Sequence, residues 1–142
     1  MRKTYRSSFV LVEIMVVIAI ISLVAAIAIP NLLRVRMNTN EISAITALRN
    51  MYSSLIMYYS SNGNSYPEQL ANLTGYLNQA LVDGEKTGYA FNYIRDSANK
   101  FHVNANPLIP GNTGGRYFYL DERSVVRFNE SGEAGADDPS TK

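Results

Sequence analysis

The chain has 142 residues, a mass of 15.8 kDa and a formal net charge of +1, which bounds it at about one domain. With 46% hydrophobic and 18% charged residues, its composition is that of a folded protein, and the charge balance argues against nucleic acid as its main partner. Cysteine is absent and histidine occurs once, as His102. A disulfide framework, cysteine-ligated zinc and thiol catalysis are therefore excluded, and a catalytic triad or a multi-histidine metal site is disfavoured.

The first predicted element is an apolar helix over residues 9–29, with the sequence FVLVEIMVVIAIISLVAAIAI. At 1.5 Å per residue this helix spans about 32 Å, close to the roughly 30 Å hydrocarbon core of a bilayer. Basic residues flank it on both sides: Arg2, Lys3 and Arg6 precede it, and Arg34 and Arg36 follow it. The excess on the N-terminal side predicts a single-pass protein with a cytoplasmic N-terminus.

Two other interpretations of this segment are a cleaved secretory signal and a plain membrane anchor. Ala26-Ile27-Ala28 offers a small-x-small cleavage site, but the apolar run exceeds the roughly 7–15-residue core of such a signal. A plain anchor explains the length of the segment and leaves Glu13 unexplained.

Glu13 interrupts the apolar segment with a carboxylate. A charged side chain in hydrocarbon costs on the order of 3 kcal/mol on insertion scales, so Glu13 indicates a partner and a function. The segment contains no Lys, Arg or His, but a cut just before Phe9 creates an α-amine four residues before Glu13. That amine could meet Glu13 in the same helix, or Glu13 of another copy in a bundle of staggered helices. The second arrangement would also set the axial register of the copies.

The N-terminal residues resemble those of a known family. A short basic leader precedes Ser8-Phe9-Val10-Leu11-Val12-Glu13, and the apolar run ends in Ala28-Ile29-Pro30-Asn31. This pattern resembles the type IV pilins and type II secretion pseudopilins, which combine an aromatic residue after a cleavage point, a glutamate shortly beyond it and a proline at the end of the apolar run. Ser8 departs from the family pattern, which nearly always has glycine there.

The resemblance implies a pilin-like α+β fold, in which a long N-terminal helix packs against a small antiparallel sheet. It implies that a prepilin peptidase cuts between Ser8 and Phe9, that Phe9 is N-methylated, and that Glu13 neutralises the amine of a neighbouring subunit. The expected protein is a structural subunit of a type IV pilus or a type II secretion pseudopilus. As a precursor it would lie in the bacterial inner membrane, and an assembly platform and motor would build it into a helical filament.

The helical period continues beyond Pro30, which predicts one helix over about residues 9–59. Because Pro30 lacks a backbone donor, we expect a kink or a local melt there. In the second half an apolar stripe recurs every three or four residues, at Ile42, Ile45, Leu48, Tyr52, Leu55, Ile56 and Tyr59. Polar residues, among them Asn40, Glu41 and Ser54, lie mostly off this stripe.

Beyond the helix, Tyr66-Pro67-Glu68-Gln69-Leu70 predicts the start of a short helical stretch. A period of two then predicts four antiparallel strands, at about 89–93, 101–105, 116–120 and 124–128, enough for one sheet that covers the helix. The predicted organisation is a leader at 1–8, a transmembrane or filament-core helix at 9–29, an amphipathic continuation at 30–62, and a sheet domain with a loose polar tail at 63–142.

No cofactor, metal or catalytic residue is predicted. His102 alternates with Phe101 and Val103, so it should point away from the core. Type II major pseudopilins can hold calcium in a C-terminal loop, but Asp121-Glu122 and Asp137-Asp138 lack the spacing of an EF-hand.

Two other functions stay open from the sequence. The first is a membrane-anchored minor pilin-like module for adhesion or DNA uptake, and the second is an enzyme tethered by its N-terminus, for which no site is visible. The near balance of charge argues against strong DNA binding. The sequence does not distinguish a pilus from a secretion pseudopilus.

Overall fold

The computed structural model describes residues 4–141, with side chains from Phe9 onward. The chain divides into two compact units, an N-terminal unit, Met1–Val35, and a sheet domain, Arg36–Lys142. Helix α1 (Thr4–Ser61) contributes to both units and confirms the predicted long N-terminal helix. The boundaries predicted for the leader, the two helix halves and the sheet domain stay predictions.

In the N-terminal unit, large apolar side chains cover α1 on every side, and they are exposed. The described residues contain one helix that is long and apolar enough to cross a membrane. Helical backbone continues on both sides of Pro30, so the local melt considered for this position does not occur. A change of helix direction at Pro30 stays a prediction.

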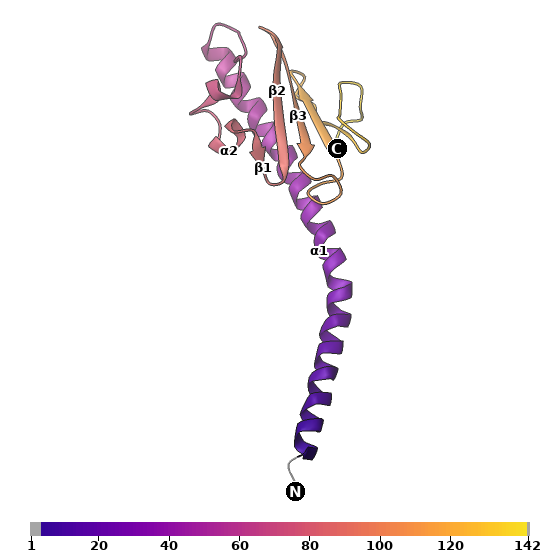
Figure 1. The fold of residues 1–142 in the computed structure, drawn as a ribbon. Helices are drawn as coiled ribbons and strands as arrows, with labels where there is room; N and C mark the ends of the chain where they lie inside the picture. The colour runs from indigo at the N-terminus through magenta and orange to yellow at the C-terminus, as the bar shows by residue number, and fades with distance from the viewer. Residues whose placement is uncertain (1–3, 142) are drawn as a thin grey trace. The chain divides into compact units, whose positions relative to one another are not determined.

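The sheet domain carries a five-stranded antiparallel sheet in which every strand pairs with its neighbour in sequence. The strands are β1 (Glu85–Lys86), β2 (Tyr89–Ser97), β3 (Lys100–Pro107), β4 (Tyr117–Asp121) and β5 (Arg127–Asn129). The sheet lies against the C-terminal part of α1 (Figure 1). The α+β fold is therefore confirmed.

One face of α1 packs on the sheet to form the core. The helix contributes Ala44, Ala47, Leu48, Met51 and Leu55, and the strands contribute Tyr89, Phe91, Phe101, Val103, Ala105, Phe118 and Leu120. The helix positions recur every three or four residues, as a helix packed on one side requires. The strand positions follow the period of two predicted from the sequence.

The buried face of α1 overlaps the predicted stripe but is shifted from it. Leu48 and Leu55 lie in the core, and Ile45, Tyr52 and Tyr59 pack against it, as predicted. Ile42 was expected in the core and is 64% exposed, and Ile56 is also exposed. Glu41 and Ser54 were expected mostly off the stripe and are buried. The helix turns its alanines toward the sheet, because small side chains let a helix and a sheet approach closely, and this rotation carries Ile42 to the outer side.

The other differences from the predicted elements are local. The two-residue strand β1 was not predicted, because it is too short to show an alternation. In place of the predicted strand 124–128, the structure has the shorter strand β5, which begins at Arg127. A turn with Ser124 at φ 64° occupies the start of the predicted strand. In place of one helical stretch from Pro67, the chain forms a 3-10 turn, η1 (Leu70–Leu73), and a single helical turn, α2 (Gln79–Val82).

The polar tail makes more contacts than the sequence predicts. The Phe128 N–H donates to the Pro139 carbonyl at 3.0 Å, and the Thr141 N–H donates to the Val126 carbonyl at 2.8 Å. The Arg127 guanidinium also donates to the Asp138 carbonyl at 2.7 Å. The end of the described chain is therefore hydrogen-bonded along β5.

Candidate assembly surfaces

The N-terminal unit places the predicted assembly residues on one face of a helix. Phe9 and Glu13 lie four residues apart in α1 and, with Val12, Val16 and Val17, they line a shallow groove of about 290 Å³. Within the part of the chain that the structure describes, no side chain donates a hydrogen bond to Glu13 or forms an ion pair with it. The peptide bond after Ser8 lies inside α1, and the Ser8 side chain falls outside the described side chains.

Ser22 shows how a polar group in this segment is satisfied when its partner is local. Its hydroxyl donates to the Ile18 carbonyl, one turn earlier, at 2.8 Å. A serine thus needs nothing beyond its own helix. The Glu13 carboxylate has only acceptors and needs a donor from elsewhere.

At its N-terminal end, the sheet domain is held to α1 by side chains that sequence analysis missed. Glu41 accepts hydrogen bonds from the Gly115 N–H at 2.9 Å and from Arg116 Nε at 2.8 Å, and its carboxylate is 6% exposed. The neighbouring Asn40 donates its amide to the Thr113 carbonyl at 2.8 Å. These contacts fix the β3–β4 loop against the helix.

A third contact at this end involves a strained turn. Ser43 and Thr87 share a hydroxyl hydrogen bond at 2.8 Å, and Thr87 sits at φ 49°, which is uncommon for a β-branched residue. The contacts with Thr87 and Thr113 join α1 to both the β1–β2 turn and the β3–β4 loop. No local sequence pattern signals them, because the partners lie far apart in the chain.

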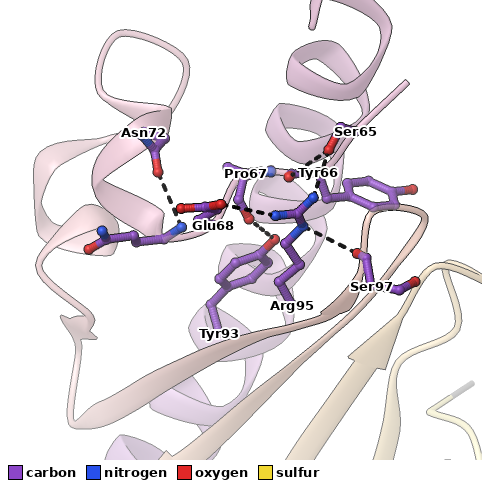
Figure 2. Close-up of polar contacts among 9 residues, drawn as sticks. Ser65, Tyr66, Pro67, Glu68, Asn72, Tyr93, Arg95 and Ser97 are labelled. Carbon is purple, nitrogen blue, oxygen red and sulfur yellow. Dashed lines mark hydrogen bonds and ion pairs between the residues drawn. The ribbon is translucent and has the colours of Figure 1, made fainter. Parts of the chain in front are cut away.

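At the other end of the sheet domain, Arg95 holds the segment that follows α1 (Figure 2). Its guanidinium donates to Ser65 Oγ at 2.9 Å and to the Ser97 carbonyl at 3.3 Å, and it lies 3.4 Å from a Glu68 carboxylate oxygen. These groups border a polar cleft of about 390 Å³.

Tyr93 adds a further tie to this segment. The Tyr93 hydroxyl donates to the Pro67 carbonyl at 2.7 Å, as Figure 2 shows. Burial raises the pKa of Tyr93 far above its usual range, so this phenol stays a hydrogen-bond donor at neutral pH.

The other residues considered from the sequence, His102 and the acids of the C-terminal loop, make local structural contacts. His102 points away from the core, with Nδ1 2.8 Å from an Asp96 carboxylate oxygen and its ring stacked on Tyr119. No group of three or more His, Asp or Glu side chains suited to a metal occurs among the described residues. In the C-terminal loop, the Asp138 carboxylate accepts hydrogen bonds from the Gly135 N–H at 2.8 Å and from the Asn129 amide at 3.3 Å.

The fold and these surfaces define a class of protein. It has an apolar helix that needs lipid or other helices around it, and the same helix continues as the spine of a small antiparallel sheet domain. Its apolar half is long enough to cross a membrane, and its other half belongs to a folded sheet domain.

Comparison with curated proteins identifies the family. Over 123 residues the chain is 31% identical to the type IV wide pilus major component PilA4 of Thermus thermophilus, covering 85% of this chain and 86% of that protein. Over 145 residues it is 28% identical to the type II secretion system core protein G of Aeromonas hydrophila, covering 97% and 92%. No family model matches the chain, and no solved structure matches it. The chain belongs to the family of type IV pilins and type II secretion pseudopilins, and it is a structural filament subunit.

Proposed function

We propose that this subunit is made as an inner-membrane precursor, cut between Ser8 and Phe9, N-methylated at Phe9, and then assembled into a helical filament. The observation that carries the proposal is Glu13, an acid without a partner among the described residues, four residues after Phe9 on an exposed apolar helix. The relatives of the chain are named as components of a pilus and of a secretion system, so the proposal covers both kinds of filament.

The proposed pairing explains why an acid stands in this segment. Cleavage exposes an α-amine on Phe9, and in a bundle of staggered helices that amine can meet Glu13 of a neighbouring copy. A desolvated pair offsets the unfavourable burial of each charge and favours one axial register. The apolar side chains exchange lipid for the helices of other copies, so leaving the membrane loses little hydrophobic free energy.

The proposed orientation has a cytoplasmic N-terminus and a sheet domain on the periplasmic or extracellular side. The basic residues before the apolar segment 9–29 outnumber those just after it, which supports this orientation. The proposed partners are a prepilin peptidase that also methylates the new N-terminus, and a membrane assembly platform with its motor.

Mass spectrometry of the mature chain tests the proposal. We expect an N-terminus at methylated Phe9, and Ser8→Gly as a matched variant should give the same start with at least as much cleaved product. A mature chain that starts at Ile29 would show simple secretion and overturn the proposal. A chain that keeps residues 1–8 in purified filaments would overturn the processing step.

A further inference from the structure

The β3–β4 loop presents an apolar tip to solvent. Leu108 and Ile109 are 48% and 56% exposed, and Pro110 beside them is also exposed. We call Leu108–Ile109–Pro110 the apolar tip. Among the described residues outside α1, Leu108 and Ile109 are the one consecutive pair of large hydrophobic side chains that are both exposed. Adjacent exposed apolar side chains mark a contact surface more often than scattered single ones do.

Hydrogen bonds hold the apolar tip in one conformation. The Ile109 N–H donates to Thr113 Oγ1 at 3.0 Å, and the Ile109 carbonyl accepts from the Thr113 N–H at 2.9 Å. The Leu108 N–H donates to the Gly88 carbonyl at 2.9 Å, and Asn40 of α1 donates to the Thr113 carbonyl at 2.8 Å. An ordered tip loses little conformational entropy on binding, so its exposed side chains are preorganised for a contact.

Two arginines indicate where the membrane surface lies along the chain. Arg34 and Arg36 follow the apolar segment 9–29 and are exposed. Arginine side chains near the end of a membrane helix extend to the headgroup level, because the stem contacts lipid while the guanidinium stays in water. In a subunit held by its apolar segment, these two arginines therefore mark the headgroup layer.

The apolar tip is fixed to α1 close to this level. Asn40, which donates to the Thr113 carbonyl, follows Arg36 by about 6 Å at 1.5 Å rise per residue. The headgroup layer is itself roughly 5–7 Å thick on each side of a bilayer. Ile42, half a turn beyond Asn40, is 64% exposed and adds a further apolar side chain at this end of the sheet domain.

We propose that, before assembly, the apolar tip lies in the headgroup layer of the membrane that holds the apolar segment. The partner of this surface is thus lipid. The chain itself argues for lipid, because the apolar segment tethers this end of the sheet domain beside the bilayer and makes the contact intramolecular. The inference rests on the membrane-held precursor proposed above and adds a second point of attachment to it.

The first test reads the surroundings of the tip with a single tryptophan. The chain has no tryptophan, so Ile109→Trp places one reporter in the tip. The sample is the full-length chain in phosphatidylcholine nanodiscs, with and without bromine on the acyl chains near the headgroup, because bromine quenches a tryptophan that contacts lipid. We expect Ile109→Trp to lose at least about half of its fluorescence in the brominated nanodiscs, as a side chain at the membrane interface should.

Ile94→Trp is the matched control, since tryptophan by itself favours a membrane interface. Ile94 is 41% exposed on β2, about 20 Å along the strand from Gly88, whose carbonyl accepts from the tip. The Ile94→Trp chain should keep its fluorescence in brominated nanodiscs. Thermal unfolding of both variants should match that of the wild type, because both side chains are exposed.

The second test measures whether water reaches the tip. The chain has no cysteine, so Ile109→Cys and Ile94→Cys each carry one thiol. In nanodiscs, a charged maleimide should react at least about fivefold more slowly with Ile109→Cys than with Ile94→Cys, because lipid restricts access to the thiol. After unfolding in urea the two reaction rates should be equal, which controls for the reactivity of the thiols themselves.

A third tryptophan separates the tip contact from membrane anchoring itself. Ile20→Trp lies in the middle of the apolar segment and should be strongly quenched. If Ile20→Trp is quenched and Ile109→Trp is not, or if Ile109→Trp and Ile94→Trp are quenched equally, the tip contact is overturned and the membrane-held precursor stands. Equal maleimide reaction rates in nanodiscs would also overturn the tip contact. An unquenched Ile20→Trp would overturn the membrane-held precursor and the tip contact together.

Discussion

Glu41 and Arg116 are 75 positions apart in the chain, and their side chains meet at 2.7 Å where helix α1 enters the sheet domain. The carboxylate of Glu41 also accepts from the backbone N–H groups of Gly115 and Arg116. Arg116 in turn lies over the rings of Phe118 and Phe128, at 5.6 and 5.4 Å from their centres. One acid thus joins the helix to the start of β4 and orients a cation over two aromatic side chains.

Glu41→Gln should destabilise the sheet domain. The substitution leaves Arg116 without its charge partner. Breaking a buried ion pair costs about 3–5 kcal/mol in free energy of unfolding, and we expect the lower value, about 3 kcal/mol, because the Arg116 side chain is 35% exposed. Urea unfolding of the detergent-solubilised chain measures this loss. Arg49→Gln, at an exposed position on the same helix, should change the free energy of unfolding by less than about 0.5 kcal/mol. Equal stability of Glu41→Gln and the wild type would contradict the prediction.

A glycine beside Tyr89 provides a second test of packing at this end. A Cβ added to Gly114 would lie 2.0 Å from the Tyr89 hydroxyl, which donates to the Arg116 carbonyl from a fully buried ring. Gly114→Ala should therefore cost about 1–3 kcal/mol in unfolding free energy, the usual effect of overpacking. Gly132→Ala is the matched control, because nothing lies within 4 Å of its added Cβ. A neutral Gly114→Ala would show that Tyr89 can move aside.

The sequence predicted the features that repeat locally. The apolar run, the residues around Phe9 and the alternation at Tyr89–Tyr93 each carry their own pattern, so the long helix, the family resemblance and the antiparallel sheet followed from them. Period and composition also predicted which strand residues face the core. These signals depend on neighbouring residues alone.

The sequence predicted the buried face of α1 only in part, and it did not predict what the polar residues on that face do. Periodicity shows which residues share a side of a helix. Ile42 is more hydrophobic than Ala44 and therefore dominates a hydrophobic pattern, yet Ala44 is the residue that is buried against the sheet. Glu41 looks like a surface residue until its partners at 115 and 116 are brought beside it. Contacts of this kind depend on the tertiary fold, which leaves no local mark in the sequence.

Alkaline pH should weaken the sheet domain. Burial raises the pKa of Tyr66, Tyr89, Tyr93 and Tyr119 above the usual value of about 10. The unfolded chain releases these protons near pH 10 while the folded chain keeps them, so the stability they contribute is present below about pH 10 and falls as pH rises above it.

Urea unfolding at about pH 8 and about pH 11 measures how far the free energy of unfolding falls between the two pH values. Tyr93→Phe should be less stable at neutral pH, because it loses the bond to the Pro67 carbonyl, yet show a smaller loss between the two pH values. Tyr76→Phe is the control for the Tyr→Phe substitution itself, since Tyr76 is 43% exposed. If Tyr93→Phe loses as much unfolding free energy between the two pH values as the wild type, Tyr93 does not contribute to the pH dependence.

Glu13 and Ser22 make a matched pair for testing filament assembly. Both are polar residues in the apolar half of α1, but the Ser22 hydroxyl is satisfied by the Ile18 carbonyl, whereas Glu13 has no partner among the described residues. If a neighbouring amine is the missing partner, Glu13→Leu should insert into membranes normally and give at least about tenfold fewer filaments, because the lost pairing matters only between copies. Ser22→Ala should assemble like the wild type. Membrane fractionation and the yield of sheared filaments separate the two steps, and normal filaments from Glu13→Leu would show that the acid does not guide assembly.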